Sequence, residues 1–127
     1  MQKTAIGEAI HLPDGSVAPL SAAYRADDLV FTSGQLAFDE RGHLNTGSVD
    51  EQTALCLANI ERILRDAGLT RDDVVKVTVW LTDAADFSDF NRAYAEFFGD
   101  HRPDRSTVRS DLMLPSARVE IEAIAAG

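Results

Sequence analysis

Two charged residues near the C-terminus, Arg105 and Glu120, have the chemistry of a substrate-binding and catalytic pair. Each lies in a stretch with the alternation of a β-strand, in which successive side chains point to opposite faces of a sheet. An arginine can bind a carboxylate through two parallel hydrogen bonds, and a glutamate can take a proton from water. The pair could therefore hold a small carboxylate-bearing substrate beside a general base.

The same alternation also fits two edge strands whose charged faces simply lie in water. The pattern alone leaves both interpretations open, a functional site and an ordinary solvated surface. In the first stretch Arg105, Thr107 and Arg109 share one face, with Ser106, Val108 and Ser110 opposite. In the second, Val119, Ile121, Ala123 and Ala125 form an apolar face, with Arg118, Glu120 and Glu122 on the charged one.

Length and composition indicate one globular domain spanning residues 1–127. The chain has 127 residues, of which 45% are hydrophobic, which suffices for one core but not for two. No run approaches the roughly 18 apolar residues of a membrane span, and the N-terminus lacks the apolar core of a signal peptide. The single cysteine, Cys56, excludes an internal disulfide and fits a cytoplasmic location.

Charge and motif spacing argue against several classes of function. The net charge is −9, with 21 acidic against 12 basic residues, and acidic residues interrupt the arginines near the C-terminus. We therefore expect no nucleic-acid partner. The glycines lack the spacing and the Lys-Ser/Thr pair of a phosphate-binding loop. The histidines, His11, His43 and His101, are far apart, so we expect no metal site.

The N-terminal third reads as three short strands. A weak signal at Thr4–Ile10 precedes the turn residues 13–15, and two further strands are expected at 21–26 and 28–34, joined by a polar turn. The third strand ends in Ser33-Gly34, where the glycine marks either a bulge or a close approach of the backbone to a ligand.

A helix then begins with the spacing of a capping box, Ser48 to Glu51, and ends at Gly68. Its apolar residues recur at helical intervals and form one stripe. Cys56 lies on this stripe, which indicates a buried structural thiol rather than a nucleophile.

A strand at 74–81 and a helix from Asp86 to Phe98, which Gly99 ends, complete the order β-β-β-α-β-α-β-β. Two amphipathic helices and one sheet are best packed with both helices on the same face. The other face then stays uncovered, which predicts self-association. We expect Val75, Val77, Val79 and Leu81 on the covered face, and Val74, Trp80 and Ile124 on the uncovered one.

The second helix carries an aromatic stripe that is most simply part of the core. Asn91 lies beside this stripe, an unfavourable place for an amide unless it has hydrogen-bonding partners. It is therefore a possible accessory to the Arg105 and Glu120 pair. The stripe consists of Phe87, Phe90, Tyr94 and Phe97.

Several stretches taken together resemble the Rid family, also known as YjgF, of reactive intermediate and imine deaminases. The resemblance extends from about residue 18 to the end of the chain, and its motifs are jointly specific. The matching stretches are Asp28–Gln35 (DLVFTSGQ), Asp73–Val79 (DVVKVTV), Asp86-Phe87 with Asn91 and Tyr94, Arg105-Ser106 with Val108, and Val119–Ala125 (VEIEAIA).

This resemblance implies an α+β fold like that of chorismate mutase, with a mixed six-stranded sheet and two helices on one face. It implies a homotrimer with clefts between the subunits, in which enamines and imines such as 2-aminoacrylate are hydrolysed to 2-ketoacids and ammonia without a cofactor. By resemblance, Arg105 binds the substrate carboxylate and Glu120 orients or activates water. Ser33, Gly34 and Thr107 line the cleft through backbone groups.

Two positions depart from the family pattern and concern substrate range and rate. Where many deaminating members have a Pro-Tyr-Ser-Gln-like segment, this chain has Leu20 in place of the cleft tyrosine. Thr107 replaces the usual cysteine and keeps its backbone amide but not the thiol. One alternative is therefore a trimer that binds ketoacids through Arg105 without catalysis. The endoribonuclease activity of some members is another, which the acidic charge disfavours.

Overall fold

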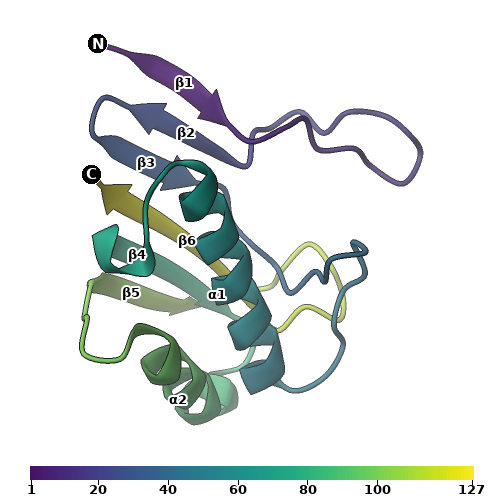
Figure 1. Cartoon of the computed structure of the whole chain (residues 1–127). Coiled ribbons are helices and arrows are strands. Elements are labelled where there is room, and N and C mark those ends of the chain that lie inside the picture. Colours follow the sequence, from purple (N-terminus) through teal and green to yellow (C-terminus); the bar gives the residue numbers. More distant parts are fainter.

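The computed structural model describes all 127 residues as one sheet with two helices packed on it (Figure 1). The strands are β1 (Lys3–Ile6), β2 (Ala23–Ala26), β3 (Leu29–Thr32), β4 (Val74–Leu81), β5 (Asp104–Arg109) and β6 (Val119–Ala126). The helices are α1 (Val49–Asp66) and α2 (Phe87–Phe98), and short 3-10 turns, η1 (Arg71–Asp73) and η2 (Ala84–Asp86), precede β4 and α2. The predicted order of elements is confirmed.

The six strands lie in the order β1-β2-β3-β6-β4-β5. β4 and β5 are parallel and joined through α2, whereas every other neighbouring pair is antiparallel, so the sheet is mixed as predicted. α1 packs on β6 and on α2, and both helices lie on the same face of the sheet (Figure 1). The opposite face carries no helix, and β5 is an edge strand with the helix α2 beside it.

The core lies between α1 and the two central strands, β4 and β6. The alternation of β6 is confirmed, because the four residues of its predicted apolar face are buried, whereas Glu120 and Glu122 on the other face are only partly covered. Cys56 is fully buried among them, and burial raises the pKa of its thiol well above the usual value. The prediction of a structural thiol is thus confirmed, since a thiol held protonated is a poor nucleophile.

The start of β4 corrects one predicted face. Val74 is buried and Val75 is 47% exposed, the reverse of the expectation. The register against β6 shifts between Val74 and Lys76, which is the mark of a bulge that turns the side chains after it to the other face. Beyond the bulge the prediction holds, because Val77, Val79 and Leu81 are buried and Trp80 lies on the uncovered face.

The aromatic stripe of α2 is also shifted from the prediction. Phe90, Tyr94 and Phe98 are buried, as their spacing of four residues places them one turn apart on the same side of the helix. Phe87 is 41% exposed and Phe97 is only partly buried, so neither is the core residue that was expected. Phe87 instead lies beyond the edge of the core, in the first turn of the helix.

The prediction of a capping box at the start of α1 is wrong in one detail. Ser48 is the N-cap residue, but its side chain makes no capping hydrogen bond to the helix backbone. Its hydroxyl interacts with the carboxylate of Asp50, which lowers the pKa of that carboxyl. The ends of both helices agree with prediction, because Gly68 and Gly99 adopt the positive φ angles, 77° and 62°, that favour glycine after a helix.

The segment between β1 and β2 projects from the body as a long loop (Figure 1). β1 is shorter than the predicted Thr4–Ile10 and ends before Gly7. One isolated bridge between His11 and Val17 closes the loop on itself. No helix of the chain is long and apolar enough to cross a bilayer.

Candidate functional site

Arg105 lies on the helix-facing side of the edge strand β5. Its register partner on β4 is Val77, a buried core residue, so both side chains point toward the helices. The Arg105 guanidinium donates through Nη1 to Asn91 Oδ1 of α2 at 2.8 Å. It also faces the Tyr94 ring, with 4.7 Å between Cζ and the ring centroid. Asn91 therefore has the hydrogen-bonding partner that an amide beside an aromatic stripe needs.

The positive charge of Arg105 has no carboxylate partner. None of the four ion pairs in the chain includes it, although acidic residues are in large excess. A half-buried cation without a counter-charge is costly, so a bound anion would stabilise this side chain. We call Arg105, Asn91, Tyr94 and Thr107 the arginine cluster.

Two hydroxyls of the arginine cluster lack a hydrogen-bonding partner. Tyr94 Oη and Thr107 Oγ1 are both buried and neither contacts a donor or acceptor of the chain. Burial raises the pKa of the Tyr94 phenol to about 12, while the Arg105 charge acts to lower it, so the phenol stays a hydrogen-bond donor near neutral pH. Buried polar groups are rarely left unpaired, and both of these belong to the arginine cluster.

Glu120 lies on the opposite, uncovered face of the sheet, opposite Trp80 of β4. Partial burial, and secondarily the charge of Glu122, raise the pKa of the Glu120 carboxyl above its usual value. A raised pKa brings a carboxylate closer to the basicity that a general base requires.

Ser33 and Gly34 meet Glu120 at the end of β3. The Ser33 hydroxyl donates to the backbone oxygen of Ser21 at 2.6 Å, and Gln35 and Ile121 exchange backbone hydrogen bonds in both directions. These contacts hold Gly34 directly against the Glu120 side chain. We call Ser33, Gly34 and Glu120 the glutamate cluster.

Gly34 leaves no room for a side chain beside Glu120. A methyl group built on its Cα would lie 2.0 Å from Glu120 Oε2. Gly34→Ala should therefore displace the Glu120 carboxylate and lower any activity that depends on this carboxylate about tenfold or more, because misplacing a reacting group by about 1 Å is costly. Stability should change little, since the clash is with the flexible end of a side chain.

Gly47 offers a matched control for this substitution. A methyl group there would lie 2.2 Å from Glu51 Oε2, a similar clash far from Glu120. Steady-state kinetics and thermal unfolding of both alanine variants would separate the effects. Equal losses of activity in the two variants would show that the Gly34 contact has no special role.

Within one chain the two clusters do not meet. Arg105 and Thr107 face the helices, whereas Glu120 faces away from them, and β4 separates their strands. The predicted pairing of Arg105 with Glu120 around one substrate therefore cannot form inside a single copy. Sequence alternation could not reveal this, because it does not relate the faces of two strands that are not neighbours in the sheet.

The aromatic support of Arg105 was missed by sequence reasoning. Phe87, Phe90 and Tyr94 all place their rings within 5.8 Å of the guanidinium carbon. Stacking on aromatic faces fixes the plane of an arginine and stabilises its charge. The aromatic stripe of α2 was the signal from which these contacts could have been predicted, because Asn91, the hydrogen-bonding partner of Arg105, lies beside this stripe.

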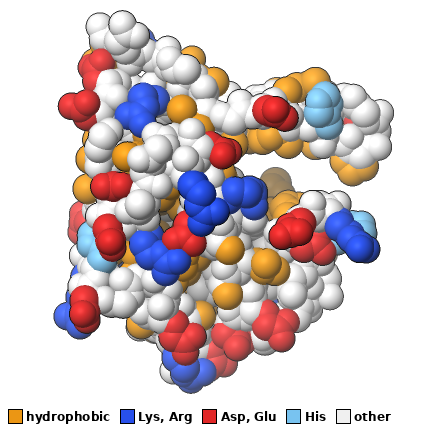
Figure 2. Space-filling view, in the orientation of Figure 1, with side chains coloured by type: hydrophobic (Ala, Val, Ile, Leu, Met, Phe, Trp, Pro, Cys, Tyr) orange, Lys and Arg blue, Asp and Glu red, His pale blue; other side chains and the backbone are white.

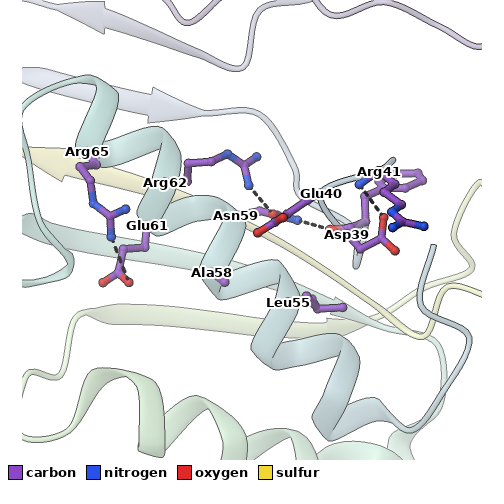
Figure 3. A pocket seen from close by; sticks show the side chains of 10 residues that line it. Asp39, Glu40, Arg41, Leu55, Ala58, Asn59, Glu61, Arg62 and Arg65 are labelled. Carbon is purple, nitrogen blue, oxygen red and sulfur yellow. Dashed lines mark hydrogen bonds and ion pairs between the residues drawn. The ribbon is translucent and has the colours of Figure 1, made fainter. Parts of the chain in front are cut away.

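The largest hollow of the chain lies elsewhere, on the outer side of α1, and shares no residue with either cluster (Figure 3). Its volume is about 580 Å³. Arg65 pairs with Glu61, and Arg62 donates to Asn59, so its polar groups are largely satisfied within the chain. Figure 2 shows basic side chains of this face lying beside acidic ones, without a broad basic patch. We assign no function to it.

No group of three or more His, Cys, Asp or Glu side chains is arranged to hold a metal ion. The two clusters instead provide a fixed cation, a carboxylate with a raised pKa and free hydroxyl donors. Such a set can bind an organic anion and move a proton to or from water.

Comparison with known proteins identifies the family. The profile of a family described as Endoribonuclease L-PSP matches residues 11–127. The chain therefore belongs to this family, the Rid (YjgF) family that the sequence resembles.

Two relatives have names that state an activity. The 3-aminoacrylate deaminase RutC of Acinetobacter baylyi is 38% identical over 120 residues, which cover 91% of this chain and 95% of that protein. The chloroplastic Reactive Intermediate Deaminase A of Arabidopsis thaliana is 40% identical over 111 residues, covering 87% of this chain and 59% of that protein. A deaminase role in this chain thus has general support from its relatives.

Among solved structures, the fold resembles that of Escherichia coli TdcF with bound serine. The TM-score is 0.85 at 32% identity, and the match covers 98% of each chain. The ligand in that structure is a small amino acid, so one close structural relative binds a molecule with a carboxylate.

Proposed function

We propose that this protein hydrolyses reactive imines and enamines that carry a carboxylate, such as 2-aminoacrylate, to 2-ketoacids and ammonia. The observation that carries the proposal is Arg105, a half-buried cation that is held by Asn91 and aromatic rings but has no counter-charge. The deaminase names of the relatives support the same reaction. Serine in TdcF supports a small ligand that carries a carboxylate, as the proposed substrates do.

The proposed reaction needs few groups from the protein. Arg105 binds the substrate carboxylate, and the enamine tautomerises to the protonated imine, whose carbon is already electrophilic. Glu120 takes a proton as water attacks this carbon, which forms the C–O bond of a carbinolamine. Glu120 then passes this proton to the amine nitrogen, and the C–N bond breaks with its electron pair leaving on ammonia. The hydroxyl proton returns to Glu120 as the ketone forms, and Glu120 releases it to the ammonia or to water. Backbone groups at Ser33, Gly34 and Thr107 line the site, and no cofactor takes part in these steps.

The site requires a second copy of the chain, and we propose a homotrimer with clefts between subunits. The uncovered sheet face carries large apolar side chains, including Tyr24 and Phe31, which are 47% and 40% exposed. Glu120 lies on this same face, whereas Arg105 lies at the sheet edge on the other face. Packing one copy against the edge of the next would bring the two clusters together.

Light scattering of the purified chain at micromolar concentration should give the mass of three copies of the 13.8 kDa chain. The physical reason is the uncovered sheet face, whose exposed apolar side chains, such as Tyr24 and Phe31, would be covered by a second copy. A stable monomer in this measurement would contradict the assembly and remove the proposed site with it.

The direct test is to generate short-lived imines with an amino-acid oxidase and to follow their disappearance with and without the protein. If the protein accelerates imine hydrolysis and this acceleration requires Arg105 and Glu120, the result supports the proposed hydrolase function. Binding of ketoacids without any acceleration would instead support the alternative, a ligand-binding trimer, for which Leu20 in place of the cleft tyrosine is the favouring observation. The cytoplasm is our proposed location, in keeping with the free thiol of Cys56.

A further inference from the structure

A mostly apolar pocket shares Thr107 with the arginine cluster, and the reaction described above assigns no role to the side chains that line it. Its volume is about 300 Å³, and we call it the β5 pocket. It lies where β4 and β5 end, next to η2 and the first turn of α2. Its lining residues are Leu81, Ala84, Phe87, Thr107, Val108 and Arg109.

The β5 pocket leaves large apolar groups in contact with water. Phe87 and Val108 are 41% and 46% exposed, although both belong to regular elements next to the core. Exposed apolar groups that line a concave surface are typical of a ligand-binding site, in which an apolar part of the ligand covers them. The carboxyl ends of parallel strands such as β4 and β5 are also a common position for such sites.

The β5 pocket is connected to the arginine cluster by two residues. Phe87 lines the pocket, and its ring centroid is also 5.8 Å from the guanidinium carbon of Arg105. Thr107 lines the pocket and follows Arg105 by two residues on the same face of β5, a separation of about 7 Å along a strand. A ligand whose carboxylate is bound by Arg105 would thus have the pocket within reach of its side chain.

Thr107 adds an independent sign that a ligand completes this pocket. Its Oγ1 is buried and has no hydrogen-bonding partner in the chain. An apolar pocket with one unsatisfied hydroxyl suits a ligand that is apolar over most of its length and has one polar group near the strand.

From these observations we propose that the β5 pocket binds the side chain of the substrate and selects imino acids with branched or aromatic apolar side chains. The proposal rests on the hydrolase function, and it goes beyond it by naming the class of substrate. Small imines such as the one derived from alanine would leave the pocket unfilled. Imines derived from leucine or phenylalanine would fill it and displace water from Phe87 and Val108.

The test compares imines produced from alanine, leucine, phenylalanine and glutamate in the oxidase assay. We expect kcat/KM for the leucine and phenylalanine imines to exceed that for the alanine imine by about tenfold or more, since one methylene in an apolar pocket is worth about tenfold or more. A preference for the alanine imine would overturn the proposal. So would a preference for the glutamate imine, which would show that Arg109 at the rim recruits a second carboxylate.

Ala84→Phe provides the variant, because it fills the β5 pocket from η2. The ratio of kcat/KM for the leucine imine to that for the alanine imine should fall about tenfold. Ala85→Phe is the matched control, since Ala85 is the exposed neighbour of Ala84 in the same turn but does not line the pocket. It should leave the ratio unchanged, and an equal fall in both variants would overturn the proposal.

Binding of stable 2-ketoacids separates a failure of this proposal from a failure of the hydrolase function. If no imine is hydrolysed faster, the function fails, but calorimetry can still compare 4-methyl-2-oxopentanoate with pyruvate. Tighter binding of the larger ketoacid, weakened by Ala84→Phe and not by Ala85→Phe, would support the pocket in a protein that does not catalyse. Equal affinities, or a change of oligomeric mass in Ala84→Phe alone, would overturn it in favour of a structural surface.

Discussion

Arg105→Lys should lower kcat/KM for carboxylate-bearing imines by about a hundredfold while the protein remains folded. A lysine keeps the charge but cannot form two parallel hydrogen bonds with a carboxylate, and it loses the stacking on the rings of α2. A hydrogen bond to a charged group is worth about 1.5–3 kcal/mol, which is the basis of this estimate. Arg105→Ala should abolish turnover. The measurement is steady-state hydrolysis of oxidase-generated imines.

Arg92 supplies the control for these variants. It lies on the same helix as Asn91, is exposed, and already pairs with a carboxylate, that of Asp89 at 3.1 Å. Arg92→Lys should leave kcat/KM unchanged, because exposed pairs of this kind contribute little. If Arg105→Lys kept near-normal activity, a bidentate carboxylate clamp could not be the right description of this residue.

Glu120→Gln should lower kcat by about two to four powers of ten and change substrate affinity much less. Glutamine keeps the shape and one acceptor oxygen but cannot take a proton from water, so mainly the transition state loses stabilisation. Stopped assays with saturating substrate would measure kcat, and binding of an unreactive ketoacid would measure affinity. A variant that lost affinity but kept kcat would show that Glu120 contacts the substrate and not the water.

Glu122 is the control within the same face of β6, and it adds a dependence on pH. Its charge is the second cause, after burial, of the raised pKa of Glu120. The base must be deprotonated, so activity should fall as the pH drops through that raised pKa. Glu122→Gln removes the repulsion, lowers the pKa of Glu120 and should move this acid limb to lower pH at nearly unchanged maximal rate. If Glu122→Gln were as damaging as Glu120→Gln, the two carboxylates would act as a unit.

Much of this fold could be predicted from the spacing of apolar residues. The alternation of 119–125, the stripe of α1 and the glycines that end both helices are local patterns with one physical solution, and each is confirmed. The error at Val74 and Val75 has a different origin. A bulge depends on the register with a neighbouring strand, and one extra residue reverses the faces without any change in composition.

The sequence could indicate which residues form a candidate site, but it could not indicate how these residues are arranged in space. The chemical types of Arg105 and Glu120 follow from the sequence. At Gly34 the sequence left open a bulge or a close approach to a ligand, and the structure shows a close approach to the Glu120 side chain. That the two charged groups lie on opposite faces depends on a crossover through α2 and on the strand order β6-β4-β5, which are tertiary features. The exposed position of Phe87 could not be predicted either. The spacing of aromatic residues along a helix does not show which of them lie beyond the end of the core.

The separation of the two clusters on opposite faces makes the proposed cleft a shared property of neighbouring copies. A copy that lacks Arg105 and a copy that lacks Glu120 would each be inactive alone. When the two are unfolded together and reassembled, a cleft that takes its arginine from one copy and its glutamate from the next would again hold both. Mixed trimers would recover one of their three clefts. If mixing the two inactive variants restored activity, this would show that each cleft is built by two chains, without a structure of the assembly.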